Sequence, residues 1–131
     1  MFVDVSVLSK DSVKIKGKNS SFVIDPMAQI QEVSADAVVF LKDIEERPAV
    51  KRVTDYRVII KGAGEYEVSG TRILGTKSDG NFLYSLSVDG ISILLARTCG
   101  LAKTQETGDY NILILNVDCD FKDTMVTSFS P

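Results

Sequence analysis

The sequence predicts a β-dominated domain of the α+β class. Three observations predict it: apolar and polar residues alternate along most of the chain, turn-forming residues separate the alternating segments, and helical periodicity is scarce. A chain of 131 residues has the usual length of one domain and can form a hydrophobic core. Because no linker or low-complexity segment divides the sequence, we expect one domain over residues 1–131.

Short strands are predicted throughout the first 41 residues. The alternating segment FVDVSVL, residues 2–8, predicts a half-buried strand, and residues 12–26 (SVKIKGKNSSFVIDP) predict two strands joined by a turn at Gly17-Lys18-Asn19. The segment ADAVVFL, residues 35–41, is continuously apolar after its aspartate. It therefore predicts a strand that is covered on both faces.

The rest of the chain predicts more strands and little helix. Residues 56–76 (YRVIIKGAGEYEVSGTRILGT) predict two or three strands, residues 81–98 a hairpin around Asp89-Gly90, and residues 110–117 a buried strand. Residues 26–34 and 42–53 can hold a turn or two of helix, the second interrupted by Pro48. The residues expected in the core are Val38, Val39, Phe40, Ile112, Leu113, Ile114 and Leu115.

Composition excludes several classes of function. The net charge is −3 and the isoelectric point is near 4.9, whereas a nucleic-acid interface normally needs a basic face. No apolar run approaches the roughly 18–20 residues that cross a bilayer, and the N-terminus lacks the basic region of a signal peptide. We therefore expect a cytoplasmic protein that binds neither nucleic acid nor membrane.

Histidine is absent from the sequence, and cysteine occurs twice. Without histidine the chain lacks the commonest general base and the commonest transition-metal ligand, and a Ser-His-Asp or Cys-His nucleophile is impossible. Cys99 and Cys119 are too few and too far apart in sequence for a disulfide framework or a zinc ribbon. We expect two buried thiols in a reducing compartment.

The order of the predicted elements carries a family resemblance. The segments VLSKDSVKIKGKNSSFVIDP (7–26), ADAVVFLKDIEERP (35–48) and GAGEYEVSGTRILG (62–75) are followed by a hairpin and the strand in GDYNILILNV (108–117). This order resembles the small metal-dependent hydrolases of the metallo-β-lactamase superfamily that are similar to ascorbate-phosphate lactonase. The resemblance implies the N-terminal part of a metallo-β-lactamase-like sandwich, with one sheet, the first strands of the second sheet and few short helices.

The same resemblance implies where a metal site would be. The family's buried strand runs into the metal-binding motif His-x-His-x-Asp-His, where this chain has LKDIEER. Ammonium, alkyl and guanidinium groups cannot donate an electron pair to zinc at neutral pH. The residues that fall on this loop, its spacer and the family's metal-bridging aspartate are Lys42, Asp43, Ile44, Glu46, Arg47 and Thr98.

Two further motifs are shared with the family and are interpreted as structural. Asp25-Pro26 is expected to end a strand and cap the next segment of the chain. The segment GAGEYE contains Gly62, Gly64, Glu65 and Tyr66 and is expected to form a tight turn leading into a strand. A phosphate cradle is the weaker interpretation, because the third glycine and an adjoining helix are missing.

Two hypotheses for the function arise from these substitutions. The first is a non-catalytic metallo-β-lactamase-like domain, with no metal or other cofactor, that acts as a binding or assembly module of unknown partner. The alternative is a metal-free enzyme that reuses the remnant pocket through Lys42, Asp43 and Glu46. Since Pro131 lies well short of the usual family length, the chain is either short or a fragment. An uncovered second sheet then predicts a homodimer through residues 81–98 and 110–117, or a protein partner that completes the sandwich.

Overall fold

Two β-sheets make up most of the computed structural model, which describes residues 3–78, 80–103 and 109–117. The helices are short: α1 spans Glu46–Ala49 and α2 spans Thr98–Lys103. The strands are β1 (Asp4–Val7), β2 (Val13–Lys16), β3 (Ser21–Ile24), β4 (Val33–Ser34), β5 (Ala37–Val39), β6 (Val53–Thr54), β7 (Val58–Ile60), β8 (Gly64–Val68), β9 (Thr71–Ser78), β10 (Asn81–Val88), β11 (Ile91–Arg97) and β12 (Ile112–Asn116). The predicted β-dominated class with few short helices is confirmed.

Each large sheet contains five described strands. The first has the order β1-β2-β3-β5-β7 and the second the order β12-β11-β10-β9-β8, while β4 and β6 form a separate two-stranded ladder. Strands β3, β5 and β7 run parallel, and so do β11 and β12, whereas the other neighbours within the two sheets are antiparallel. The second sheet, of which only the first strands were predicted, thus has as many described strands as the first.

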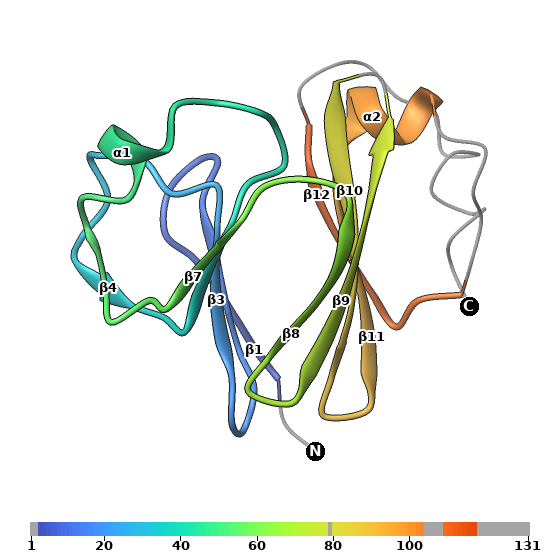
Figure 1. The fold of residues 1–131 in the computed structure, drawn as a ribbon, viewed down its shortest axis with the longest axis horizontal. Coiled ribbons are helices and arrows are strands. Elements are labelled where there is room, and N and C mark those ends of the chain that lie inside the picture. Colours follow the sequence, from blue (N-terminus) through green and yellow to red (C-terminus); the bar gives the residue numbers. More distant parts are fainter. Residues whose placement is uncertain (1–2, 79, 104–108, 118–131) are drawn as a thin grey trace.

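The inner faces of the two sheets share one apolar core. Figure 1 shows the sheets side by side, with their strands running in roughly the same direction. Ile15 and Phe22 of the first sheet belong to the same buried cluster as Ile73, Tyr84 and Ile93 of the second. Alternation places these side chains inward, because successive residues of a strand point to opposite faces.

The central strand β5 is buried on both faces, as its apolar sequence predicted. Ala37 and Val39 belong to the core between the sheets, whereas Val38 and Phe40 pack in a second cluster beneath the β4–β6 ladder and α1. Val38, Val39 and Phe40 are all 0% exposed, which confirms that part of the predicted core. In Figure 1 this outer layer, with α1 and β4, lies on the far side of the first sheet from β8–β12.

The chain passes between the sheets at the glycine-rich turn between β7 and β8. A methyl group on Gly75 of β9 would lie 2.7 Å from the Gly62 carbonyl oxygen and 2.9 Å from the Tyr84 ring, so only glycine fits this close approach. The Tyr84 hydroxyl accepts a hydrogen bond from the Gly62 amide and donates one to the Phe40 carbonyl, each 2.9 Å long. Tyr84 of the second sheet is therefore linked by two hydrogen bonds to backbone groups that follow β5 and β7 of the first sheet.

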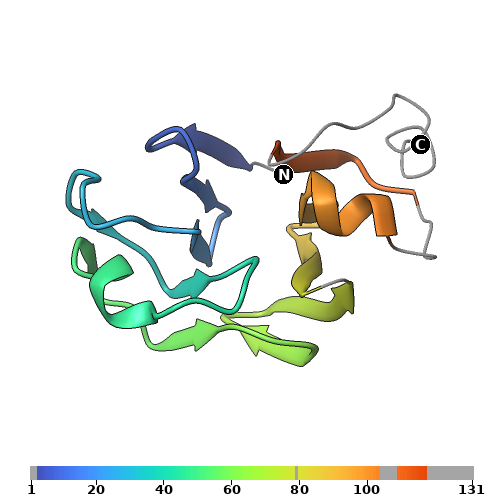
Figure 2. The ribbon, with the colours of Figure 1, turned by 90° about the horizontal axis from the view of Figure 1, so that it is seen from above.

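The side opposite this crossing is bordered by two edge strands. Figure 2 shows β1 and β12 on the same side of the molecule, away from the connection between β7 and β8. All four residues of β1 are exposed, so the prediction of a half-buried strand is wrong. Val7 is 77% exposed and Val5 44%, because each lies at the open edge of the first sheet.

Strand β12 is also less buried than predicted. Ile112, Leu113, Ile114 and Leu115, which were expected to be largely buried core residues, are each partly buried and pack at the border of the core. The reason is the edge position of β12, which pairs only with β11 among the described strands. Its inward residues contact the shared core and its outward ones contact a third cluster that includes Leu101 of α2.

The remaining sequence predictions are mostly confirmed. The turn after Lys16, the three strands between residues 56 and 76, and the hairpin around Asp89-Gly90 are all present. Within residues 26–34 only a turn and then β4 form, and α1 is limited to four residues around Pro48. Among the described residues, no helix is long and apolar enough to cross a membrane.

Cys99 was predicted to be a free buried thiol, and this prediction is wrong. Its sulfur is disulfide-bonded in the structure. Cys119, the other predicted thiol, lies outside the described residues.

Candidate functional site

A pocket opens where strands of both sheets end. Its volume is about 500 Å³, and it receives residues from the loop after β1 (Lys10, Asp11), from the ends of β3 and β11 (Asp25, Arg97), and from β12 (Asn116). Ile44, from the loop that resembles the family's metal-binding loop, also lines it. The topology therefore gathers at one place several segments that were identified separately in the sequence.

Asp25 is the central buried acid of this pocket. It follows β3 in the left-handed backbone region, with φ at 47°, and its side chain is only 5% exposed. One carboxylate oxygen accepts a hydrogen bond from the Leu41 amide at 2.9 Å, and the Ser12 hydroxyl donates to the Asp25 carbonyl. Asp25 thus ends its strand, as predicted. It also caps the amide that follows β5 in the neighbouring part of the sheet.

Arg97 brings a permanent cation to the other carboxylate oxygen. Its Nη2 atom lies 3.1 Å from Asp25 Oδ2, and its side chain is 18% exposed. The Nε atom is buried and has no hydrogen-bond partner among the described residues. Because Arg97 follows Leu95 by two positions on β11, its side chain projects from the core-facing side of the second sheet toward the first.

Burial dominates the protonation behaviour of Asp25. Removal of the carboxyl from water raises its pKa above the ordinary value of 3.8, and the nearby Asp11 carboxylate contributes in the same direction. The Leu41 amide and the Arg97 guanidinium oppose this shift and lower the pKa, but they do not cancel it. For the charged form of Asp25, loss of hydration thus outweighs the stabilisation from the Leu41 amide and the Arg97 guanidinium.

Lys61 holds the loop that resembles the metal-binding motif. Its ammonium lies 3.0 Å from a Glu46 oxygen and 3.2 Å from an Asp43 oxygen, and it donates a hydrogen bond to the Ile44 carbonyl at 3.1 Å. The hydrogen bonds from Lys61 to Glu46 and Asp43 raise the pKa of this lysine above 10.5. The two carboxylates of the loop thus face a lysine rather than the pocket.

The other residues of the predicted remnant are scattered. Lys42 and Arg47 are exposed, and Lys42 forms an isolated backbone bridge with Asn81. Thr98 is fully buried at the start of α2. Of the six predicted residues, only Ile44 lines this pocket, and Lys42, Asp43 and Glu46 do not.

The GAGEYE segment forms the crossing between the sheets. Gly62 and Gly64 have φ values of 147° and 145°, and the Tyr66 hydroxyl donates a hydrogen bond to the Gly62 carbonyl. Glu65 is exposed at the start of β8. Pro26 follows Asp25 at the rim of the pocket. These motif residues shape the connection and the pocket wall.

The residues of the pocket and of the loop between β5 and α1 do not fit a zinc centre. A catalytic zinc site takes three protein ligands from histidine, cysteine and carboxylate side chains. Asp25 already contacts an arginine, and Asp43 and Glu46 contact a lysine. No group of three such side chains able to hold a metal occurs in the described part of the chain.

Comparison with known proteins identifies the fold. No family model and no curated protein sequence matches the chain. A Thermotoga maritima structure, assigned to the Zn-dependent hydrolases of the metallo-β-lactamase superfamily, superposes with a TM-score of 0.68 at 22% identity. The protein has the metallo-β-lactamase fold. The match covers 86% of this chain but only 59% of the Thermotoga chain.

A second structure with this architecture comes from Parabacteroides distasonis. It is assigned as a metal-dependent hydrolase and also superposes with a TM-score of 0.68, at 14% identity. The match covers 98% of this chain and 79% of the Parabacteroides chain. The resemblance predicted from the sequence is thus confirmed for the metallo-β-lactamase fold.

Two important cations were not predicted from the sequence: Arg97, which lines the pocket, and Lys61, which contacts the loop between β5 and α1. Arg97 has a recognisable signal, since it occupies a core-facing position in the alternation of β11, where Ile93 and Leu95 precede it. Lys61 has no such signal, because its partners lie 15 and 18 residues away in a loop. In the sequence, Lys61 is therefore only an ordinary charged residue beside a predicted strand.

Proposed function

We propose that this chain is a metal-independent, non-catalytic module with the metallo-β-lactamase fold, used for binding or assembly. The ion pair of Arg97 with Asp25 carries the proposal. A guanidinium beside the buried carboxylate supplies the positive charge at the position where strands of both sheets end. A divalent cation placed there would be repelled by that guanidinium.

The second support is the pairing of the acidic residues in the loop between β5 and α1. Its carboxylates Asp43 and Glu46 bind Lys61, so the loop has its own counter-cation. At the positions matched to family histidines, Lys42, Ile44 and Arg47 offer no electron pair to a metal. The alternative of a metal-free enzyme through Lys42, Asp43 and Glu46 has less support, because these side chains do not converge on the pocket.

Metal analysis tests this proposal directly. The protein is dialysed against zinc or manganese, then against buffer, and its metal content is measured by elemental analysis. We expect well under one ion per chain and no phosphodiesterase, lactonase or β-lactam hydrolysis. Stoichiometric metal that is lost on Asp43→Asn or Glu46→Gln, or hydrolysis that depends on either residue, would falsify the proposal.

We further propose that the two sheets form a metallo-β-lactamase-like sandwich and that the chain forms a two-fold homodimer. Its support is the exposure of apolar residues along the side bordered by β1 and β12, including Val5. Soluble proteins seldom leave a large apolar patch uncovered, and two-fold dimers are the commonest oligomers. The hairpin β10–β11 is interior to its sheet, so of the two predicted segments β12 is the better candidate for the contact.

Light scattering coupled to size exclusion at micromolar concentration measures the assembly. A homodimer supports the proposal, and Val5→Lys should shift it toward monomer. Binding of a different chain instead would favour the predicted partner that completes the sandwich. A monomer that binds neither a second chain nor a hydrophobic dye would contradict both forms of the proposal.

A further inference from the structure

We propose that the pocket between the sheet ends binds a small organic acid, whose carboxylate contacts Arg97 and Lys10 and whose apolar part lies against Val7 and Leu8. This inference rests on the proposed function, because it gives Arg97 the role of an anion anchor in a pocket without metal. It adds a ligand class, which the fold and the comparisons do not supply.

The polar end of the pocket keeps a buried donor, the Nε atom of Arg97, that has no hydrogen-bond partner among the described residues. Arg97 has five N–H donors, and the structure shows one of its nitrogens bound to Asp25. Both Asp25 carboxylate oxygens are engaged, one by Leu41 and the other by Arg97. Arg97 and Lys10 line the same cavity, so a carboxylate there would meet two cations. A planar guanidinium suits a carboxylate especially well.

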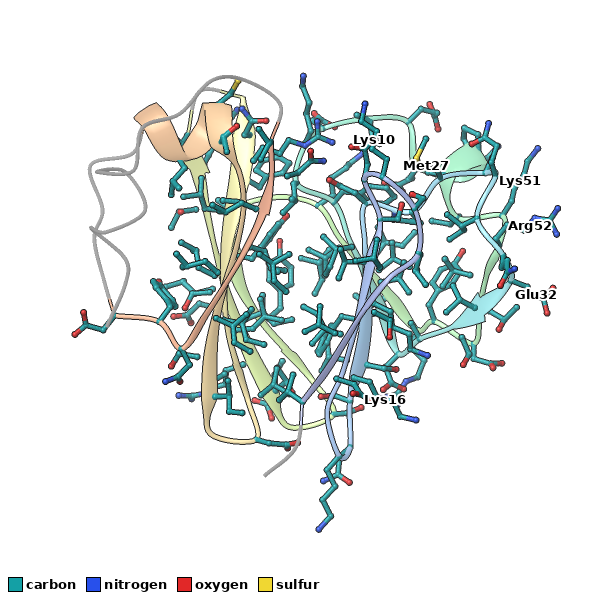
Figure 3. The ribbon with its side chains drawn as sticks, turned by 180° about the vertical axis from the view of Figure 1, so that it is seen from behind. Lys10, Lys16, Met27, Glu32, Lys51 and Arg52 are labelled. Carbon is teal, nitrogen blue, oxygen red and sulfur yellow. The ribbon has the colours of Figure 1, made fainter. Side chains whose placement is uncertain are left out.

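The body of the ligand would lie in a neighbouring hollow of mixed lining, where Val7, Leu8 and Ile30 are apolar and Ser9, Gln29 and Gln31 are polar. The hollow has a volume of about 620 Å³ and shares Lys10, Asp11 and Met27 with the first pocket. Its further lining includes Val7 and Leu8. Figure 3 shows Lys10 and Met27 close together at the end of the molecule opposite Lys16. A ligand with a charged head and an apolar body would therefore use both hollows.

Asp11 limits which acids fit. Its carboxylate lines both hollows and repels a second negative charge, so a ligand with a single carboxylate is favoured. A hydroxyl group next to the carboxylate could donate a hydrogen bond to Asp11. The pocket thus selects a monocarboxylate with a neighbouring hydroxyl and an apolar body over a dianionic phosphate ester.

Mandelate is a probe with these three features. Binding of mandelate, phenylacetate, mandelamide and phenyl phosphate is followed by NMR chemical-shift changes of the full chain in buffer with EDTA. We expect millimolar mandelate to shift signals of residues around Lys10 and Arg97, phenylacetate to bind several-fold more weakly, and mandelamide to give no saturable shifts. Phenyl phosphate binding as tightly as mandelate would overturn the preference for a monocarboxylate.

Variants separate this site from nonspecific binding. Lys10→Met should weaken mandelate binding several-fold, and Arg97→Lys at least tenfold, whereas Lys16→Met at the opposite end of the same hairpin should not change it. Lys10→Met and Lys16→Met alter exposed side chains, so folding is retained in both even if Arg97→Lys unfolds. Equal binding of mandelate and mandelamide, or no effect of Lys10→Met, would overturn the ligand class. Mandelate binding that requires added zinc would instead contradict the metal-independent function.

Discussion

Arg97 and Asp25 join the two sheets through an ion pair of 3.1 Å at the centre of the pocket. Arg97 ends β11 of the second sheet, and Asp25 follows β3 of the first. Their side chains are 18% and 5% exposed, so both charges are largely removed from water. Such a pair is expensive to bury, but breaking it by removing one partner is more expensive still.

Arg97→Ala should therefore destabilise the protein strongly. The substitution leaves the Asp25 carboxylate buried without a cation, which typically costs about 3–5 kcal/mol. The double variant Arg97→Ala with Asp25→Asn should recover part of this loss, because asparagine can still accept from the Leu41 amide and tolerates the positive φ. Urea denaturation measures both. A loss below about 1 kcal/mol for Arg97→Ala would show that the pair is solvated.

Stability should also depend on pH through Asp25. Since burial raises its pKa above 3.8, the folded protein binds this proton more tightly than the unfolded chain. The free energy of unfolding of the wild type, relative to Asp25→Asn, should therefore increase as the pH falls from about 7 toward about 4, and level off below that. Denaturation of the two proteins across this range gives the difference. A difference that decreases on acidification would mean that pairing with Arg97 outweighs desolvation.

The sequence predicted the strands well and the functional geometry poorly. The pattern of apolar residues along a strand is a local property of the sequence. The hairpin around Asp89-Gly90 and the burial of β5 on both faces therefore followed from it directly. Burial at a sheet edge depends on which strand lies beside it, which is why Val7 and Ile114 are more exposed than predicted. An ion pair across the fold is harder still to predict from local sequence, because its partners can be far apart in the chain: Arg97 lies 72 residues from Asp25.

Lys61→Met should loosen the loop between β5 and α1 without unfolding the protein. The substitution removes a cation that contacts Asp43, Glu46 and the Ile44 carbonyl, so these three residues lose a shared partner. Amide hydrogen exchange of residues 43–46 should accelerate several-fold, while exchange in β5 stays unchanged. Lys51→Met, an exposed lysine close to the same loop in sequence, is the control and should leave exchange as it was. Equal exchange in both variants would mean that the contacts to Lys61 do not order the loop.

Truncation of Phe40 should cost more stability than truncation of Ile114, because Phe40 lies in the core and Ile114 lies at its edge. Phe40→Ala removes a side chain that is 0% exposed and should cost on the order of 3–5 kcal/mol, as for core aromatics in general. Ile114 is only partly buried on edge strand β12, so Ile114→Ala should cost less, about 1–2 kcal/mol. Thermal and urea denaturation compare the two. A larger loss for Ile114→Ala would place β12 in the centre of the core and contradict its edge position.

Tyr84→Phe tests how much the hydrogen bonds of the Tyr84 hydroxyl contribute to stability where the two sheets meet. The change keeps the ring but removes the hydroxyl that binds the Gly62 amide and the Phe40 carbonyl. Both backbone groups would lose this partner beside a residue that is 0% exposed, and unpaired buried groups cost about 1–3 kcal/mol. Tyr56→Phe is the matched control, because Tyr56 packs at the edge of the outer cluster with a partly buried ring. We expect Tyr84→Phe to lower the free energy of unfolding by about 1 kcal/mol or more beyond the effect of Tyr56→Phe. Equal losses would mean that water replaces the hydroxyl at the crossing and that apolar packing alone joins the sheets there.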